Sequence, residues 1–219
     1  MSELVVFGTG TFAELVDFYL THDSDHEVVA FTADREYVDD ETAYGRPLAP
    51  FDVVTDRYPP EEYAMFVAVG YRDVNRLRAE KFAAAKAKGY ELVSYVCSES
   101  THWGDTEVGE NCFVFEDQTI QPFVELGDDV VLWSGNHVGH HATLGDHSFV
   151  TSHVVISGYV DVEPYAFLGV NATLRDEVTV GESCVVGAGA TVVDDTEPES
   201  VYLGQPAERY DADSGEVGI

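Results

Sequence analysis

Positively charged residues are scarce in this sequence. Its 219 residues include 11 Lys and Arg against 41 Asp and Glu, which gives a formal net charge of −30 at pH 7. A chain this acidic repels polyphosphate, so a broad nucleic-acid-binding face is excluded. The acidic, lysine-poor composition resembles that of proteins from salt-loving organisms, in which high salt screens the repulsion between carboxylates. We therefore expect a halophilic protein with no nucleic-acid partner.

Long apolar runs and cysteines are scarce too. No run is long enough to span a bilayer, and no charged segment followed by an apolar one marks a signal peptide after Met1. This favours a cytoplasmic protein with no membrane partner. The three cysteines, Cys97, Cys112 and Cys184, are an odd and sparse set that we interpret as core residues.

A strict six-residue repeat of aliphatic side chains occupies the second half of the sequence. A fixed short period of this kind is typical of a parallel β-helix, in which successive coils stack around one continuous core. Three units form one triangular coil, so residues eighteen apart should lie above one another at a spacing of about 4.8 Å. Residues 108–197 then form about five coils. The repeated positions are Val108, Val114, Ile120, Leu126, Leu132, Val138, Leu144, Val150, Ile156, Val162, Leu168, Leu174, Val180, Val186 and Val192.

Glycine follows the aliphatic residue in seven of these units. Because glycine has no Cβ to restrict its backbone, we expect these residues to lie at turns that need unusual backbone angles. They are Gly109, Gly127, Gly139, Gly145, Gly169, Gly181 and Gly187.

The first hundred residues follow a different pattern, in which short apolar strands alternate with helices. Strands are expected at residues 4–7, 28–32, 65–69 and 91–96, and helices at 14–20 and 73–88. Such alternation predicts a small parallel sheet wrapped in helices, a Rossmann-like α/β domain. We expect this domain to span residues 1–97 and the all-β helix to span residues 98–200. A capping segment and acidic tail follow at 201–219, with Asp211 to Ile219 disordered.

The α/β domain carries a Gly-rich turn between its first strand and first helix. In such sheets ligands bind beyond the carboxyl ends of the strands, where Gly8-x-Gly10-x-x-Ala13 lets a phosphate approach the helix N-terminus. Asp34 follows the second strand, where a carboxylate can accept a ribose hydroxyl, and Gly70 ends the third. A Gly-bearing turn without a ligand is the alternative interpretation.

A small Gly-turn domain followed by a hexapeptide helix resembles the sugar acyltransferases of the sialic-acid and bacillosamine pathways. The resemblance implies that the helix is left-handed and that the protein is a homotrimer with acyl-CoA bound in clefts between subunits. It also implies that the N-terminal domain holds a nucleotide-activated sugar, whose binding residues here would be Gly8, Gly10, Asp34 and Gly70. The expected reaction is transfer of an acetyl group from acetyl-CoA to a sugar amino or hydroxyl group.

Histidines cluster inside the repeat, with five of the eight at His137, His140, His141, His147 and His153. The interior positions are aliphatic or small, so most of these imidazoles should project outward.

The segment that begins at His140 resembles the family segment in which a histidine is the general base. An imidazole suits proton abstraction at neutral pH. His141 stands beside it where the family has a carboxylate, which leaves open what orients the His140 imidazole. Gly158 follows eighteen residues later, one coil above, and its N–H could stabilise the oxyanion of the tetrahedral intermediate. His140, His141 and Gly158 therefore form the predicted catalytic set.

Two further groups of residues complete the predicted site. Acceptor contacts are expected from Asn136, His137, His147 and His153. Acetyl-CoA is expected along the stacked column of Ser152, Val170 and Ala188, beside Gly187, and near the closing segment that contains Pro206 and Arg209.

Two other functions remain open. Trimeric hexapeptide helices also include zinc-dependent carbonic anhydrases of the gamma type, in which three histidines from two subunits bind the metal. Their pattern resembles a histidine, a second about thirty-six residues later and a third five further on. Here His102 and His137 are thirty-five apart and position 142 is Ala, so we expect no metal. The other alternative is a scaffold that binds nucleotide sugars without catalysis.

Overall fold

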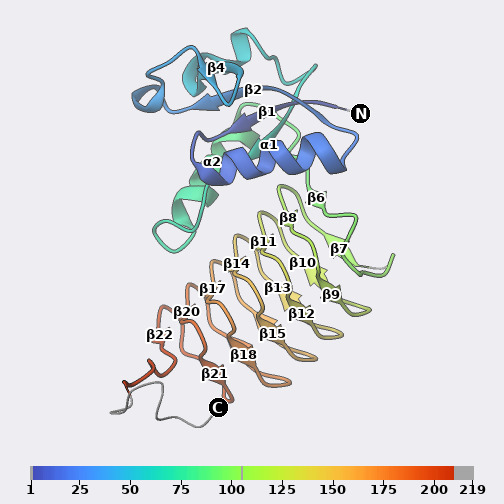
Figure 1. Cartoon of the computed structure of the whole chain (residues 1–219), viewed down its shortest axis with the longest axis vertical. Helices are drawn as coiled ribbons and strands as arrows, with labels where there is room; N and C mark the ends of the chain where they lie inside the picture. The colour runs from blue at the N-terminus through green and yellow to red at the C-terminus, as the bar shows by residue number, and fades with distance from the viewer. Residues whose placement is uncertain (1, 105, 210–219) are drawn as a thin grey trace, which may run out of the picture.

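The computed structural model describes residues 2–104 and 106–209, and in this part an α/β sheet leads into a long parallel β-helix (Figure 1). The sheet has the strand order β3-β4-β2-β1-β5, in which only β3 runs antiparallel. Its elements are β1 (Glu3–Phe7), α1 (Thr11–Asp23), β2 (Glu27–Ala33), η1 (Arg35–Tyr37), β3 (Thr42–Ala43), β4 (Arg46–Pro50), η2 (Phe51–Asp56), β5 (Ala64–Val67) and α2 (Arg76–Ala87).

The α/β part differs from the prediction at several places: strands β3 and β4 are unexpected, and α1 is longer than the predicted range 14–20. Helix α2 begins at Arg76 rather than at Asp73, because residues 73–75 have positive φ angles of 46° to 66° that a right-handed helix does not accept. Of the strand expected at residues 91–96, only β6 (Tyr95–Val96) forms, and it pairs with the β-helix. The division of the chain at residues 97 and 98 stays a prediction.

The β-helix has three parallel sheets, one for each side of the triangular coil. Partners in neighbouring strands from β6 to β21 are eighteen residues apart, as in Glu125 and Thr143, so the expected stacking register is confirmed there. The last coil is two residues shorter, since Val185 on β20 pairs with Val201 on β22. Fourteen of the fifteen repeated aliphatic side chains build one continuous core, as predicted. Val108, the first of the series, is exposed and lies outside this core. The strands are β7 (Glu107–Val108), β8 (Phe113–Val114), β9 (Thr119–Ile120), β10 (Glu125–Leu126), β11 (Val131–Leu132), β12 (His137–Val138), β13 (Thr143–Leu144), β14 (Phe149–Val150), β15 (Val155–Ile156), β16 (Asp161–Val162), β17 (Phe167–Leu168), β18 (Thr173–Leu174), β19 (Thr179–Val180), β20 (Val185–Val186), β21 (Thr191–Val192) and β22 (Val201–Tyr202).

The prediction for the repeat glycines is wrong, because their φ angles are not positive. At all of these glycines except Gly187, close approach between coils leaves no room for a side chain: a Cβ on Gly109 would lie 2.5 Å from the carbonyl carbon of Gly127. The left-handed conformation instead occurs three residues after the aliphatic one, mostly in residues other than glycine. All fourteen of these residues have φ angles between 57° and 81°: Asn111, Asp117, Phe123, Asp129, Gly135, His141, His147, His153, Tyr159, Tyr165, Asn171, Glu177, Ser183 and Gly189.

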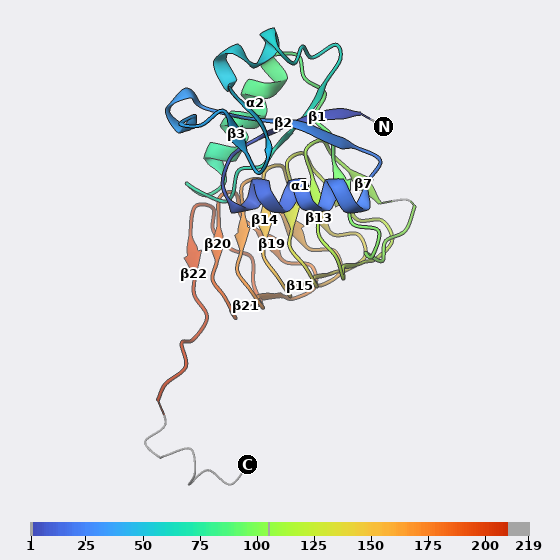
Figure 2. The ribbon, with the colours of Figure 1, turned by 45° about the horizontal axis from the view of Figure 1, so that its top comes forward.

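The α/β part covers one side of the β-helix, the sheet that contains β8, β11 and β14. Figure 2 shows α1 lying along this side. The outward-facing side chains Phe113 and Phe149 are buried, and the ring of Phe12 on α1 packs edge-on against Phe113 at 5.8 Å between centroids. Tyr19 adds a hydrogen bond of 2.7 Å from its hydroxyl to Glu116 Oε2. This apolar contact fixes the position of α1 relative to the coils.

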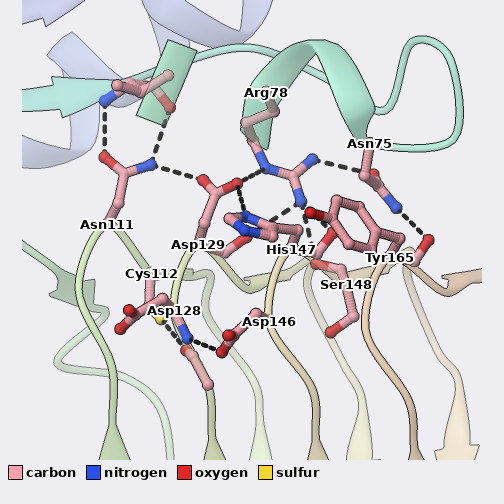
Figure 3. A network of polar contacts seen from close by, with 12 residues as sticks. Asn75, Arg78, Asn111, Cys112, Asp128, Asp129, Asp146, His147, Ser148 and Tyr165 are labelled. Carbon is pink, nitrogen blue, oxygen red and sulfur yellow. Dashed lines mark hydrogen bonds and ion pairs between the residues drawn. The ribbon is translucent and has the colours of Figure 1, made fainter. Parts of the chain in front are cut away.

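A buried polar network fixes α2 in the same way (Figure 3). The guanidinium of Arg78 donates to Asp129 Oδ2 at 3.0 Å and to the carbonyl oxygen of His147 at 2.7 Å. Both Arg78 and Asp129 have fully buried side chains. Asn75, at the start of α2, donates to the carbonyl oxygen of Tyr165 at 2.9 Å. Helix α2 is therefore held by one corner of the β-helix.

Within the described residues, no helix is both long enough and apolar enough to cross a membrane. The acidic tail predicted at Asp211 to Ile219 lies outside the residues that the structure describes.

Candidate active site

A cavity of about 970 Å³ in the α/β part lies beyond the carboxyl ends of β1, β2 and β5. Gly8, Gly10, Asp34 and Gly70 all line it. The structure thus brings together the four residues that the sequence predicted as a binding site. Its position agrees with the rule that ligands of open α/β sheets bind beyond the strand ends.

The Gly-rich turn shapes one wall of this cavity. Gly8 has a φ of 127°, and a Cβ there would lie 2.6 Å from the carbonyl oxygen of Ala68. Gly10 precedes α1 in an extended conformation, and a Cβ there would meet no atom within 4 Å. The N-terminus of α1 is therefore accessible from the cavity, where its N–H groups and dipole favour an anion.

Three basic side chains, Arg72, Arg76 and Lys81, line the same cavity and were missed by the sequence analysis. Lys81 Nζ lies 2.9 Å from Asp34 Oδ2 and 3.0 Å from Glu80 Oε1. Partial burial lowers the pKa of the Lys81 ammonium, but the hydrogen bonds to the two carboxylates outweigh it and the pKa lies above its ordinary value. A signal was present in the sequence, because six of the eleven basic residues fall within residues 72–88.

His140 lies on the edge between β12 and β13, and its side chain is exposed. Its backbone N–H donates to Gln121 Oε1 at 2.9 Å. Its ring lies against Gly158, where an added Cβ would be 2.7 Å from His140 Cε1. The predicted stacking of Gly158 on His140 is therefore present, and only glycine leaves room for the ring in this position. His141 Nδ1 lies 3.3 Å from His140 Nδ1.

The backbone N–H of Gly158 is already paired in this structure. It donates to Asp176 Oδ1 at 3.0 Å. Stabilisation of an oxyanion by this N–H would require the Asp176 carboxylate to move away, because one N–H cannot donate fully to both acceptors. The oxyanion role of Gly158 stays a prediction with this added requirement.

The clustering of histidines has a structural component. His141, His147 and His153 occupy left-handed corners of the coils, a conformation in which His, like Asn and Asp, is several-fold enriched. His147 is largely buried, and its Nδ1 lies 2.9 Å from Asp129 Oδ2 within the network that holds α2. The ring of His153 packs on Gly135. The predicted acceptor contact by His147 therefore competes with a structural role.

Asn136 does not fit its predicted role as an acceptor contact. Only 1% of its surface is exposed, and its Oδ1 accepts the backbone N–H of Val154 at 2.7 Å while its Nδ2 donates to the Trp133 carbonyl oxygen. Assembly with further copies could only bury it more. The neighbouring His137 is half-buried on β12 and stays a candidate contact.

The residues predicted to bind acetyl-CoA lie along another corner of the coils. Backbone hydrogen bonds from Asn171 N–H to the Ser152 carbonyl oxygen and from Gly189 N–H to the Val170 carbonyl oxygen confirm that they stack. Val170 and Ala188 are exposed, whereas Ser152 and Gly187 are half-buried. Pro206 and Arg209 are exposed in the segment that follows β22. The column is accessible, and its role in binding stays a prediction.

The cysteines do not offer a nucleophile. All three are buried and unpaired with one another, and burial raises the pKa of the Cys112 thiol to about 12. Since the thiolate is the reactive form, a covalent acyl-cysteine route is disfavoured at neutral pH.

The segment that carries His140 and Gly158 also matches a known family. The bacterial transferase hexapeptide family (six repeats) matches residues 123–158. This match shows a segment of hexapeptide repeats within the β-helix. The matched segment covers two complete coils and includes both stacked residues of the predicted catalytic set.

The chain is similar to solved structures over nearly its whole length. PerB from Caulobacter crescentus, solved with CoA and GDP-perosamine, is 27% identical and superposes with a TM-score of 0.82, covering 95% of this chain and 97% of that chain. The acetyltransferase domain of PglB from Neisseria gonorrhoeae is 24% identical with a TM-score of 0.84, covering 96% of this chain and all of that domain. That domain has also been solved with acetyl coenzyme A.

These likenesses confirm the predicted fold, a small α/β domain followed by a left-handed parallel β-helix. They also confirm the predicted resemblance to hexapeptide-repeat sugar acetyltransferases.

Proposed function

We propose that this protein is an acetyl-CoA-dependent transferase that acetylates an amino or hydroxyl group of a nucleotide-activated sugar. The observation that carries the proposal is the match over 95% of the chain to PerB, whose structure contains both CoA and GDP-perosamine. The match includes the α/β part as well as the β-helix, so it supports both a sugar-nucleotide partner and an acyl-CoA partner.

The cavity of the α/β part would hold the nucleotide. The N-terminus of α1 and the side chains of Arg72, Arg76 and Lys81 offer N–H donors and positive charge for phosphates. Asp34 would accept a ribose hydroxyl, in exchange for part of its contact with Lys81.

Chemistry would take place at His140 by direct attack. The sugar nitrogen or oxygen attacks the thioester carbonyl carbon while His140 accepts the proton of the attacking group. The tetrahedral intermediate then collapses, the carbon–sulfur bond breaks, and the proton on His140 passes to the leaving thiolate of CoA. No enzyme-bound acyl group is formed, in keeping with the buried cysteines.

Assembly as a homotrimer belongs to this proposal. The α/β part covers the sheet of β8, β11 and β14, whereas His140 lies on the edge between the other two sheets. The α/β part, which contains the cavity, and His140 of the same chain therefore lie on different sides of the β-helix. We propose that a sugar held in one copy reaches the His140 of a neighbour. The exposed rings of Phe123 and Tyr159 beside this edge support burial against another copy.

A screen of nucleotide sugars tests the proposal. Thermal unfolding in molar salt is followed with UDP-, dTDP-, GDP- and CMP-linked sugars, with and without acetyl-CoA, and release of the CoA thiol is measured for each pair. We expect at least one sugar to raise the melting temperature and to release CoA. Binding without release favours the scaffold alternative, and zinc bound to protein purified without chelators favours the anhydrase alternative.

Trimer assembly is tested by mixing two inactive variants. Copies with His140→Ala and copies with Lys81→Ala are dissociated and reassembled together. If the cavity of one copy serves the His140 of another, mixed trimers regain activity that neither parent has. Light scattering that shows a monomer, or mixed trimers without activity, contradicts the shared site.

A further inference from the structure

His140 and His141 form a hydrogen-bonded pair through the same atom of each ring. The two Nδ1 atoms are 3.3 Å apart, and the rings are nearly perpendicular at 86°. A hydrogen bond between two neutral imidazoles requires that one Nδ1 carries the proton and the other accepts it. The pair therefore links the protonation pattern of one ring to that of the other.

His141 is held in place by the rings above and below it. It stacks on Tyr159 with centroids 4.7 Å apart and 16° between the planes, and it lies 4.7 Å from Phe123 in a tilted arrangement. These three residues are eighteen apart and share the left-handed corner conformation. Tyr159 also contacts the His140 ring edge-on at 5.1 Å. The column thus orients both imidazoles.

We propose that His141 is a positioning residue that selects the reactive tautomer of His140. In this arrangement His140 Nδ1–H donates to the unprotonated Nδ1 of His141, so the lone pair of His140 is on Nε2. Nε2 is then the atom that accepts the proton of the sugar amine or hydroxyl, and Nδ1 keeps its proton throughout. The inference rests on the proposed function only for the identity of the substrate.

The same geometry explains how the His140 imidazole can be oriented although no carboxylate follows it in the sequence. A neutral imidazole acceptor fixes the tautomer and the ring angle, as a carboxylate would, but adds no negative charge to stabilise the imidazolium that forms. His141 therefore acts through orientation, and a carboxylate at this position should serve at least as well.

Two substitutions at His141 separate orientation from folding. His141→Phe removes the acceptor but keeps a ring between Phe123 and Tyr159. His141→Glu replaces it with a carboxylate acceptor. Both residue types already occupy this column in the left-handed conformation, Phe at Phe123 and Glu at Glu177, so both variants are expected to fold. Asp117→Phe, at a left-handed corner of another column, is the matched control.

The direct readout is the nitrogen NMR spectrum of the His140 ring at pH 8, assigned with the His140→Asn variant. In the wild type and in Asp117→Phe we expect a protonated Nδ1 and an unprotonated Nε2. In His141→Phe we expect the populations to shift toward the opposite tautomer, and in His141→Glu we expect them to return. An unchanged His140 spectrum in His141→Phe overturns the proposal whether or not the protein transfers acetyl groups.

Kinetics give the second readout. We expect His141→Phe to lower kcat about 10- to 100-fold, less than the full worth of a general base, with KM values changed less than about threefold. His141→Glu should restore kcat to within about threefold of the wild type. Equal loss in the Phe and Glu variants contradicts the tautomer role. Absence of transfer by the wild type on every sugar refutes the proposed function, while the spectra still decide the inference.

Discussion

At the scale of single residues, the absence of a side chain at Gly158 shapes the candidate site as much as His140 does. The His140 ring occupies the volume that a Cβ on Gly158 would need. Gly139 is restricted differently, because a Cβ there would lie 2.5 Å from the backbone nitrogen of Gly158. A side chain at position 158 would thus displace the His140 ring, which can move, whereas a side chain at position 139 would collide with backbone that cannot move aside.

This difference predicts that one alanine substitution lowers turnover and the other lowers thermal stability. Gly158→Ala should leave the melting temperature nearly unchanged but lower kcat about 100-fold, since a misplacement of about 1 Å at a reacting group can cost that much. Gly139→Ala should lower the melting temperature, because neighbouring coils must separate. Thermal unfolding and CoA release measure the two effects. Unchanged turnover in Gly158→Ala would show that the ring position seen here does not matter.

At the scale of secondary-structure elements, α2 connects the cavity with the β-helix. Arg76 and Lys81 on this helix line the cavity, while Arg78 enters the buried network with Asp129. Removal of one partner leaves the other charge buried without compensation, which costs about 3–5 kcal/mol. The network therefore stabilises the fold only as long as both charges are present.

Arg78→Ala should accordingly lower the free energy of unfolding by about 3–5 kcal/mol. The exposed Arg175 in the β-helix provides the matched control, and Arg175→Ala should stay within about 0.5 kcal/mol of the wild type. Denaturant titration in molar salt measures both. A loss for Arg78→Ala no larger than that of the control would contradict the structural importance of the network.

The carboxylate of Asp23 connects the C-terminal end of α1 to the segment at residues 95–98. Asp23 accepts hydrogen bonds from the Ser98 hydroxyl and the Tyr95 hydroxyl, which lower the pKa of this carboxyl to about 2. Because this value lies below the unfolded value of about 3.9, the carboxylate contributes stability that is fully present above about pH 4. That contribution is lost as the pH falls through about 2.

Asp23→Asn should therefore destabilise the protein by a constant amount between about pH 7 and pH 5, and by progressively less below about pH 4. Thermal unfolding of wild type and variant across this range measures the difference, with Asp56→Asn at an exposed carboxylate as the control. A difference that stays constant down to pH 2 would show that the hydrogen bonds to Asp23 do not depend on its charge.

At the scale of the whole molecule, charge is distributed unevenly. The chain has 11 basic and 41 acidic residues, but the cavity is lined by three basic side chains and four acidic ones, Asp34, Glu36, Asp73 and Glu80. The cavity is thus close to electrically balanced within a strongly negative protein. Approach of an anionic nucleotide sugar or CoA is opposed mainly by the surrounding surface, whose field salt screens.

We therefore expect thermal stability and acetyl transfer to rise with KCl into the molar range. An uncharged osmolyte at equal osmolality should not reproduce the effect, because screening requires ions. The salt dependence of kcat/KM and of the melting temperature provides the test. Full activity and stability in dilute buffer would refute the interpretation of this charge as an adaptation to salt.

Features of the structure that follow from a fixed spacing of residues could be predicted from the sequence. The strict period of six predicted which side chains point inward and that Gly158 lies above His140. The strand ends predicted the cavity around Gly8 and Asp34. The left-handed corners escaped prediction because residues other than glycine occupy most of them, including His141.

Contacts between distant segments could not be predicted from the sequence. Arg78 meets Asp129 only after the α/β part docks on the β-helix, and no local pattern records that pairing. The buried position of Asn136 escaped for the same kind of reason, since its bond to Val154 joins neighbouring coils.

The central claim is that His140 accepts the proton during acetyl transfer. The most direct test measures kcat for His140→Ala with the sugar that the screen identifies, together with the dissociation constants of that sugar and of acetyl-CoA. We predict that kcat falls about 10²- to 10⁴-fold, the usual worth of a general base, while both dissociation constants change little. Turnover close to that of the wild type, or a loss confined to apparent affinity, would contradict the account.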